Sequence, residues 1–404
     1  MITRRKFLTI AGAGAGLALL PAEFAELVRA VAHSEQRWPG PGVETWVNTV
    51  CQLCPGGCGI RVRLLDGWPV KIVGNPEHPI NRGGLCPKGA AGLQALYDPD
   101  RIRRPLKRVG ARGSGQWQEI GWDEAISSVA QRLGALREAG RPEGLIVIGG
   151  QYRGLTRALW DRFLAAFGSP NYVSTAAGGD ASDAVLHLTE RVRGHLGYDL
   201  ENTNYLLSFG VNLLEGSWSP VWQMRAYTHL RQGGPAPRAR IVQVDVRFST
   251  TAAKADEWLP VKPGTDEALA LGMAHVLVRD GLYDREFVRR HTSGFEPFQA
   301  LVMRHYPPSE VARITGVAES TIVRVAREFG QARPAIAIAD RGVSRYANGL
   351  STRWAIHCLN ALAGSIGTRG GVLVPPEIPL APLPPLPRDP GAERGRSRPR
   401  VDGV

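Results

Sequence analysis

The chain has 404 residues, of which 43% are apolar and 21% are charged. These proportions are those of an ordinary globular protein, and the length allows more than one domain. The net charge of +12 does not predict nucleic-acid binding, because no aromatic residues are interleaved with the basic stretches. Basic stretches beside a cofactor would instead suit anionic ligands.

The first residues have the features of an export signal. Arg4 and Arg5 precede a mildly apolar run over residues 8–20, and a small-residue cleavage site follows at residues 30–32. The run is too short and too weakly apolar to span a membrane. We therefore expect residues 1–32 to be a twin-arginine signal peptide, with a Sec signal and a chance arginine pair as the alternative. The twin-arginine machinery exports folded proteins, so we expect a periplasmic protein or one on the outer face of the cytoplasmic membrane.

Four of the five cysteines form one pattern, Cys51-x2-Cys54-x3-Cys58 followed by Cys86. Four thiolates are what a [4Fe–4S] cluster needs, and the Gly/Pro-rich loop between the first three lets backbone N–H groups approach the cluster sulfides. A structural zinc more often uses two C-x2-C pairs. A protein held by disulfides would not need to fold before export. The pattern predicts the cluster, with zinc or two disulfides as alternatives.

Residues 45–100 are expected to form a small cluster-binding domain. Apolar and basic residues alternate over 60–64, as in a half-buried strand, and Asp66-Gly67 is a hairpin turn before a second strand over 70–73. This β-hairpin would bring Cys86 back to the other three cysteines.

From residue 101 the pattern alternates between strand and helix. We expect strands over 145–148, 205–210, 240–246 and 335–339, and helices from 122 and over 155–167, 220–230, 266–279 and 350–362, with several more within 284–331. Repeated βα units predict an α/β fold of doubly wound parallel sheets with ligands at the carboxyl ends of the strands. The strand over 145–148 is a continuous apolar run, which predicts that it is buried. Residues 372–404 are rich in Pro and Arg, which predicts an extended linker or disordered tail.

The cysteine pattern, its sequel Cys86-Pro87-Lys88-Gly89 and the βα body resemble the molybdopterin oxidoreductases of the dimethyl sulfoxide reductase family. The resemblance covers about residues 45–373 and rests also on Gly168-Ser169-Pro170-Asn171, Phe209-Gly210-Val211-Asn212, Val244-Asp245-Val246-Arg247, Lys262-Pro263-Gly264-Thr265-Asp266, Gly342, Asn348-Gly349 and Leu359-Asn360-Ala361-Leu362. It implies molybdenum or tungsten held by two pyranopterin guanine dinucleotides, with electrons passing through the [4Fe–4S] cluster. It also implies one α/β domain over 101–180 and 333–371, and a second, dinucleotide-binding one over 181–332.

Six residues are expected to bind the dinucleotides. Glycine-containing turns after strands let backbone N–H groups reach a phosphate at a helix N-terminus, and Asp245 ends a predicted strand, where it can accept ribose or guanine donors. Asp266 either reads a guanine edge or caps a helix. The full set is Asn212, Asp245, Gly264, Asp266, Asn348 and Gly349.

Two further side chains are assigned by the resemblance. Lys88 resembles the family lysine between cluster and pterin, where a buried cation would raise the cluster potential and assist electron relay; a solvated surface lysine is the alternative. The family commonly supplies one side-chain ligand to the metal, and the aligned position here is Gly179. Asp180 is the tentative ligand, with Ser174, Thr175 and Ser182 as poorer candidates. Cys358 is expected in the core.

The resemblance implies an oxidoreductase that passes electron pairs between a small oxo or sulfur substrate and the cluster, in anaerobic-type respiration. An iron–sulfur subunit and a membrane anchor are expected partners. Relatives normally continue into a β-rich domain that closes over the pterins, so either another polypeptide supplies it or the chain is truncated. The alternative function is a non-catalytic, molybdopterin-like subunit of a membrane quinone complex.

Overall fold

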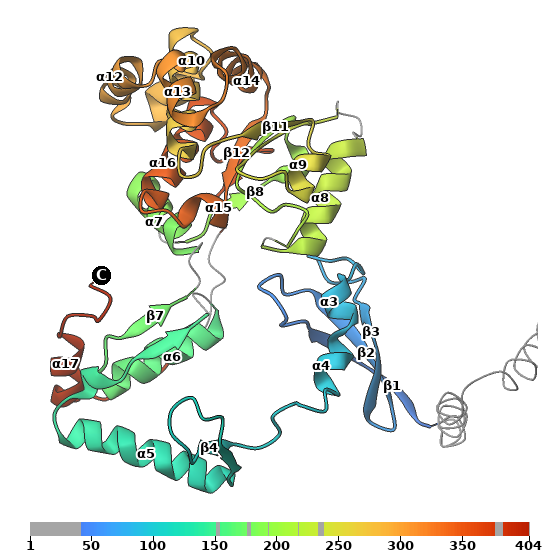
Figure 1. Ribbon diagram of the computed structural model, residues 1–404, viewed down its shortest axis with the longest axis vertical. Helices are drawn as coiled ribbons and strands as arrows, with labels where there is room; N and C mark the ends of the chain where they lie inside the picture. Colours follow the sequence, from blue (N-terminus) through green and yellow to red (C-terminus); the bar gives the residue numbers. More distant parts are fainter. Residues whose placement is uncertain are drawn as a thin grey trace, which may run out of the picture. The chain divides into compact units, whose positions relative to one another are not determined.

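The computed structural model describes residues 42–150, 154–175, 179–192, 194–216, 218–232, 238–375 and 383–403 (Figure 1). The predicted signal peptide over 1–32 lies outside these residues. The chain divides into two compact units. The first comprises the described residues up to Val50 together with Gly59–Leu96, and the second comprises Cys51–Cys58 and the chain from Tyr97 onward.

The first unit is a three-stranded antiparallel sheet. Its strands β1 (Glu44–Val50), β2 (Gly59–Leu65) and β3 (Trp68–Gly74) lie in the order β1-β2-β3. The predicted hairpin is confirmed: Leu65 pairs with Trp68 across the Asp66-Gly67 turn, in which both residues have positive φ. The sequence analysis did not predict β1. Two short helices follow, α3 (Pro87–Ala90) and α4 (Gly92–Leu96).

The second unit is built on a four-stranded parallel sheet with the order β11-β10-β9-β12. Its strands are β9 (Tyr205–Phe209), β10 (Arg240–Asp245), β11 (Glu257–Pro260) and β12 (Ala335–Ala339), all paired in parallel. This confirms the predicted α/β class. The predicted domain bounds stay a prediction, although β12 pairs with β9 across the proposed boundary at 332/333.

Alternate residues of these strands face two different helical layers, as the period of two requires. Leu207, Phe209 and Val244 pack with α10 (Asp266–Arg279), α14 (Glu319–Gln331) and α16 (Gly349–Leu362). Leu206 and Ile241 pack on the other face with α8 (Pro220–Gln232) (Figure 1). Further helices are α7 (Gly179–Glu190), α9 (Thr250–Lys254), α11 (Arg285–His291), α12 (Phe295–His305), α13 (Pro308–Thr315) and α15 (Arg341–Ser344).

Residues 101–175 form shorter elements. A hairpin of β4 (Leu106–Arg108) and β5 (Trp117–Glu119) precedes α5 (Trp122–Glu138), and β6 (Val147–Gly149), α6 (Leu155–Phe167) and β7 (Tyr172–Ser174) follow. β6 and β7 pair in parallel as a two-stranded sheet. The prediction of a buried strand over 145–148 is wrong in one respect, because Ile148 is 71% exposed. A last pair joins β8 (Gly197–Tyr198) to β13 (Val372–Leu373).

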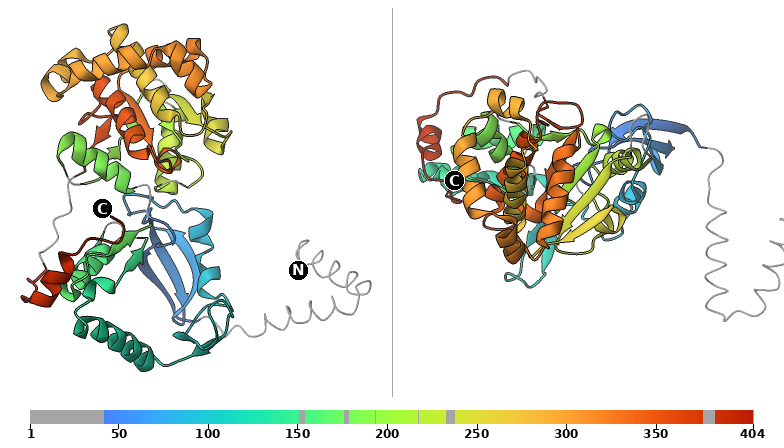
Figure 2. Two further views of the ribbon diagram at one scale, coloured as in Figure 1. Left: turned by 60° about the vertical axis from the view of Figure 1, so that its left-hand side comes forward. Right: turned by 90° about the horizontal axis from the view of Figure 1, so that it is seen from above.

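The C-terminal segment corrects the prediction of a linker or disordered tail over 372–404. Helix α17 (Pro390–Arg396) packs against α6 and against Pro142, and Figure 2 shows α17 beside α6. Its small residues Ala392 and Gly395 are buried beside Gly168. Asp389 accepts a hydrogen bond from Ala392 N at 3.0 Å and pairs with Arg137. Small side chains, a helix cap and an ion pair thus hold α17 against α6 and Pro142, although the composition of this segment does not predict that it packs on the rest of the chain. In the described part of the chain, no helix is long and apolar enough to cross a membrane.

Candidate functional site

The carboxyl ends of β9 and β12 meet through two glycines. Gly210 follows β9 with a φ of 59°, and Gly342 lies in α15 directly after β12. A Cβ built on Gly342 would lie 2.6 Å from the carbonyl oxygen of Gly210, a distance that real Cβ atoms do not reach. The lack of a side chain at both positions therefore lets the two loops approach closely at the sheet edge where α/β proteins bind ligands.

Asn212 lies two residues beyond Gly210 and is fixed by an arginine from the next strand end. Nη2 of Arg247 donates to Asn212 Oδ1 at 3.2 Å and to Glu215 Oε2 at 2.8 Å. The same carboxylate accepts from Thr250 N through its other oxygen, at 3.1 Å. These hydrogen bonds thereby connect the loop after β9 to the loop after β10 at the carboxyl edge of the sheet.

Asp245 and Asp266 are two buried carboxyl groups at this edge. Asp245 ends β10, and Asp266 is the first residue of α10; they are 8% and 5% exposed. Burial, helped by the nearby charge of Asp245, raises the pKa of Asp266 to about 6. Thr265 is the N-cap residue of α10, so Asp266 does not take the helix-cap position that was its alternative. A carboxyl group with this raised pKa is partly protonated near pH 6, so it can donate as well as accept hydrogen bonds there.

The beginnings of α10 and α16 are tied together by hydrogen bonds. Asn348, the N-cap residue of α16, donates from Nδ2 to the Gly264 carbonyl at 3.3 Å and to Glu267 Oε2 at 3.0 Å. Ser351 Oγ donates to the same Glu267 oxygen at 2.8 Å. Gly349 is buried, and a Cβ there would lie 2.7 Å from the Ser344 carbonyl oxygen. Two helix N-termini, with their free backbone N–H groups, are thus held at one edge of the sheet, as an anionic ligand requires.

Several buried polar atoms near this edge have no hydrogen-bond partner within the described residues. Ser208 and Gln243 are cross-strand neighbours in β9 and β10, and Ser208 Oγ and Gln243 Oε1 are both unpaired. Arg353 is 5% exposed, and its Nη2 is 3.8 Å from Asp340 Oδ1, too far for a hydrogen bond. Unsatisfied buried groups are rare and call for a ligand or ordered water. A dinucleotide, with phosphates and many polar edges, fits them.

The structure therefore brings together all six residues predicted to bind dinucleotide on the edge of one unit. The prediction that they bind it stays a prediction. Sequence reasoning missed the buried Gln243, Asp340 and Arg353. Asp340 directly follows the apolar strand β12, and this position at a strand end was the signal that could have found it.

The cysteines fall in two places. Within the second unit, Cys51 N donates to the Cys58 carbonyl at 2.8 Å and closes the cysteine loop, while Ser219 lies against Gly56 of that loop. In the first unit, Cys86 is the N-cap residue of α3, whose first residue is Pro87. Lys88 is exposed there, so its placement beside a pterin stays a prediction.

The donor chemistry fits an iron–sulfur cluster. None of the five cysteines, all within the described residues, forms a disulfide, which removes the disulfide alternative from this structure. In the described part of the chain, no three or more His, Cys, Asp or Glu side chains are gathered closely enough to hold a metal ion. The assignment of Cys51, Cys54, Cys58 and Cys86 therefore rests on their chemistry and spacing. Burial raises the pKa of the Cys358 thiol to about 12, and a thiol that stays protonated is a poor ligand.

The predicted metal-ligand region lies at the start of α7. Gly179 and Asp180 are the first residues of this helix, and the Asp180 side chain lies outside the described part. Thr175 Oγ1 donates to the Gly149 carbonyl at 3.3 Å, so this alternative ligand already has a partner. Asp180 as the metal ligand stays a prediction.

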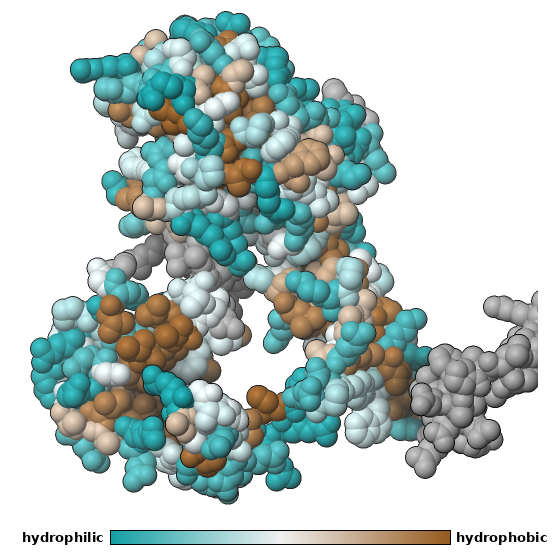
Figure 3. Space-filling view, in the orientation of Figure 1, coloured by the Kyte–Doolittle hydropathy of each residue, from teal (hydrophilic) through white to brown (hydrophobic). Residues whose placement is uncertain are grey.

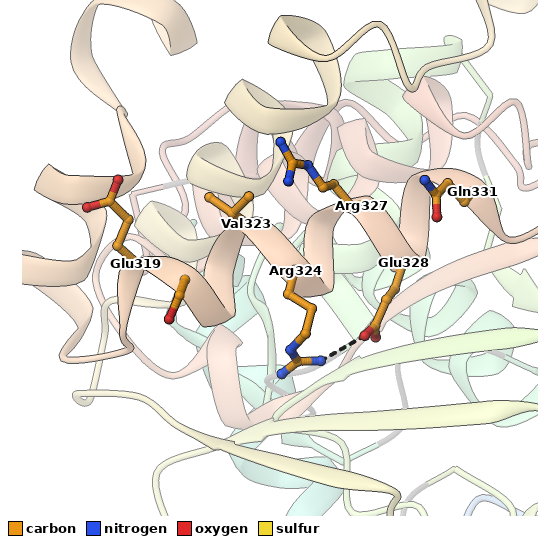
Figure 4. Close-up of a pocket in the computed structure, with 7 residues that line it drawn as sticks. Glu319, Val323, Arg324, Arg327, Glu328 and Gln331 are labelled. Carbon is orange, nitrogen blue, oxygen red and sulfur yellow. Dashed lines mark hydrogen bonds and ion pairs between the residues drawn. The ribbon is translucent and has the colours of Figure 1, made fainter.

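A surface groove along α14 is a weaker candidate. Figure 4 shows Arg324 directed toward Glu328, at 2.8 Å, and Arg324 also pairs with Glu257 at 2.5 Å. Arg327 pairs with Asp280 at 2.7 Å. Its arginines are thus already neutralised by carboxylates of the same unit, so the groove lacks the unpaired groups of the sheet edge.

Residues 101–374 match the family model of the molybdopterin oxidoreductases. The chain belongs to this family. Residues 44–98 match the model of the molybdopterin oxidoreductase Fe4S4 domain. These two matches assign the chain its cofactors, a [4Fe–4S] cluster and a molybdenum bis-pterin centre, as the sequence analysis predicted.

Several relatives of this molybdopterin oxidoreductase chain are named as subunits of reductases. It is 30% identical to the arsenate respiratory reductase molybdopterin-containing subunit ArrA of Shewanella sp. (strain ANA-3), covering 84% of this chain and 42% of that protein. It is 35% identical to the thiosulfate reductase molybdopterin-containing subunit PhsA of Salmonella typhimurium, covering 82% and 42%. The menaquinone reductase molybdopterin-binding-like subunit of Nitratidesulfovibrio vulgaris is 33% identical, covering 92% and 52%.

A solved structure supports the fold. Acetylene hydratase from Pelobacter acetylenicus superposes with a TM-score of 0.70 at 28% identity, covering 81% of this chain and 44% of that one. The chain thus spans about half the length of the relatives it matches.

Proposed function

We propose that the chain is the N-terminal part, or the corresponding subunit, of an exported molybdopterin-dependent oxidoreductase. It would pass electron pairs between a small oxo or sulfur substrate and the [4Fe–4S] cluster, in anaerobic-type respiration. The observation that carries the proposal is the gathering of Asn212, Asp245, Gly264, Asp266 and Asn348 at one strand edge with unpaired buried polar atoms. The metal centre would supply the two-electron chemistry, and these residues would bind and orient its dinucleotides.

Two side chains would act near the cofactors. Asp180 would bind the metal, and Lys88 would raise the reduction potential of the cluster. Lys88→Met should then lower the potential in a redox titration followed by the cluster signal, while iron content stays unchanged. Lys71→Met, another exposed lysine of the same unit, is the matched control; an equal shift in both variants would refute a specific role for Lys88.

Metal analysis tests the main proposal directly. The protein should be matured in a host that makes the pterin cofactor and measured for iron and for molybdenum or tungsten. Iron near four atoms per chain together with stoichiometric molybdenum or tungsten is the expected result. The absence of both molybdenum and tungsten above trace would refute it. Signal cleavage and periplasmic recovery after twin-lysine replacement of Arg4 and Arg5 test the export route.

Electron transfer calls for a partner. A single cluster carries electrons no farther than its surroundings, so we propose an iron–sulfur subunit that faces it and connects it to a membrane anchor. Full quinol-linked activity of the chain as a lone protein would contradict this proposal.

A second function is favoured by two observations. Glycine stands at the aligned metal-ligand position, and one relative is named a molybdopterin-binding-like subunit of a menaquinone reductase. In this alternative the chain is a non-catalytic scaffold in a quinone complex. In the metal analysis, this alternative predicts iron without molybdenum or tungsten. The main proposal predicts iron together with one of these two metals.

A further inference from the structure

The first unit has very little apolar core. Among its described residues, Ile60 is the one apolar side chain that is buried. Val47 and Val50 of β1 are 46% and 47% exposed, and Figure 3 shows hydrophobic residues at the surface of this unit. Small domains with so few buried apolar side chains usually depend on a metal site or on other cross-links. Hydrogen bonds within this unit therefore contribute more to its shape than they would in a larger domain.

One buried side-chain amide makes several of these hydrogen bonds. Asn81 is fully buried and lies in the loop between β3 and α3. Its Oδ1 accepts from Gly59 N at 2.9 Å, and its Nδ2 donates to the carbonyls of Gly59 and Gly84, both at 2.8 Å. Gly59 directly follows Cys58, and Gly84 precedes Cys86 by two residues. The amide of Asn81 thus connects two backbone segments that lead directly to predicted cluster ligands.

The turn that follows Asn81 is strained. Arg82 has a φ of 41°, in the left-handed region that favours glycine, and Gly83 follows with a φ of 84°. Gly84 N donates to the Asn81 carbonyl at 2.7 Å and closes the turn. The Gly83 carbonyl oxygen packs so closely on Gly74 that a Cβ on Gly74 would clash with it. A non-glycine residue keeps such a conformation only where its surroundings fix it, so this turn is held in place from both sides.

We propose that Asn81 is a positioning residue for the [4Fe–4S] cluster. It holds the turn before Cys86 beside Gly59, the residue bonded to Cys58, so that the backbone leading to both ligands is in place before the cluster is inserted. Binding of the cluster must otherwise close the whole segment between these two cysteines, and a preformed link removes part of that entropic cost. The inference rests on the cluster that the family model assigns and not on the proposed reaction. Both proposed functions contain this cluster.

A side-chain amide matches this place because it needs both an acceptor and donors. An aspartate at position 81 would keep the acceptor for Gly59 N and lose both N–H donors. Its carboxylate would also face the carbonyl oxygens of Gly59 and Gly84 in a buried position, which is unfavourable. Asn81→Asp is therefore a variant of nearly equal size that keeps one of the three side-chain hydrogen bonds, and Asn81→Ala keeps none.

Oxidative iron loss from the full chain with its cluster tests this role. Ferricyanide takes one electron from a [4Fe–4S]²⁺ cluster, and where one ligand is loosely held, one iron leaves as Fe²⁺ and a [3Fe–4S]⁺ cluster remains. Electron paramagnetic resonance detects this product, which Asn81→Ala and Asn81→Asp should form at least about tenfold faster than the parent. Asn75→Ala is the matched control, because Asn75 lies in the same loop and its side chain accepts from Glu77 N at 3.1 Å, within the loop itself. The control should lose iron at the parental rate.

The form of the cluster separates positioning from general stability. A misplaced Cys86 releases the one iron that it binds, whereas unfolding of the unit releases all the iron at once. Loss of the whole cluster from the Asn81 variants without a [3Fe–4S] signal would therefore overturn the proposal, as would iron loss no faster than in Asn75→Ala. Failure of both Asn81 variants to fold would also overturn it, because Asn81 would then be needed for the fold itself.

Discussion

Gly342 stands so close to Gly210 that a Cβ on the first would lie 2.6 Å from the carbonyl oxygen of the second. This contact joins the loop after β12 to the loop after β9, two strands that are neighbours in the sheet. The obstructing atom belongs to the backbone and cannot rotate away. The candidate dinucleotide edge therefore depends on the absence of two side chains as much as on the presence of polar ones.

Gly342→Ala should destabilise the protein by about 1–3 kcal/mol, the range for overpacking, because the added Cβ would meet the backbone of Gly210. Urea unfolding of the variant checks the value. Gly134→Ala is the control, since Gly134 lies in α5 and a Cβ there would meet no atom within 4 Å. The control should keep or slightly raise stability, because alanine is the better helix former. Equal stability of the Gly342 variant and the parent would contradict the close contact.

Asp266→Asn should stabilise the protein increasingly as pH rises from 4 to 7. Its pKa is raised from 3.8 to about 6, so the folded state binds the proton more tightly than the unfolded state. The stability that this group contributes is complete below pH 3.8 and is lost as pH rises through about 6. Asparagine does not ionise, so the difference between variant and parent should grow by up to about 3 kcal/mol over this range. Urea unfolding at several pH values measures it.

Asp280→Asn provides a control of opposite sign. Hydrogen bonds from Arg279 lower the pKa of Asp280 to about 2, so its contribution is present above pH 3.8 and is lost as pH falls through about 2. This variant should be less stable than the parent at pH 7, and the difference should shrink in acid. The same pH trend in both variants would show that neither trend comes from the carboxyl replaced.

Cys86→Ser should lose most of its iron, whereas Cys358→Ser should keep it. A serine oxygen is a harder and poorer iron ligand than a thiolate, while the Cys358 thiol has a pKa raised by burial to about 12 and stays protonated. Iron content and cluster absorbance of the two purified variants provide the measurement. Iron retained in the first variant and lost in the second would reverse the ligand assignment.

Ala392→Asp should undock the C-terminal segment, because it places an unpaired charge beside Gly168. Trypsin should then cut at Arg394 or Arg396 at least tenfold faster, as a docking loss of about 1.4 kcal/mol implies. Glu393→Ala, at an exposed neighbouring position, should leave the cutting rate unchanged. Equal rates for all three proteins would mean that α17 does not protect the segment.

The sequence predicts most regular elements of the second unit, since their signals are local. The predicted bounds of α6, α10 and β12 coincide with those of the structure, because helical spacing or a short apolar run is bounded by Gly, Pro or a capping residue. The six dinucleotide candidates were found in the same way, as glycines, Asn or Asp directly after strands or at helix starts.

What could not be predicted depends on long-range contacts. The docking of α17 comes from the fit of Ala392 to Gly168, which no local pattern encodes. An apolar stretch likewise shows that a neighbour is needed, without showing whether the neighbour is present. Ile148, in a strand predicted to be buried, is therefore 71% exposed. Whether the buried side-chain atoms of Gln243 and Arg353 find hydrogen-bond partners is decided only when strands and helices from distant segments meet.

The position of β12 in the sheet has a consequence for how the protein is made. β12 pairs with β9, yet it leaves the ribosome only after α10, α11, α12, α13 and α14. During that interval β9 has one unpaired edge, the kind of surface that invites wrong pairing and slows folding. The Gly210–Gly342 contact forms only when this edge is closed. A nascent chain halted before residue 335 therefore lacks both β12 and Gly342, so its candidate dinucleotide edge is not yet formed.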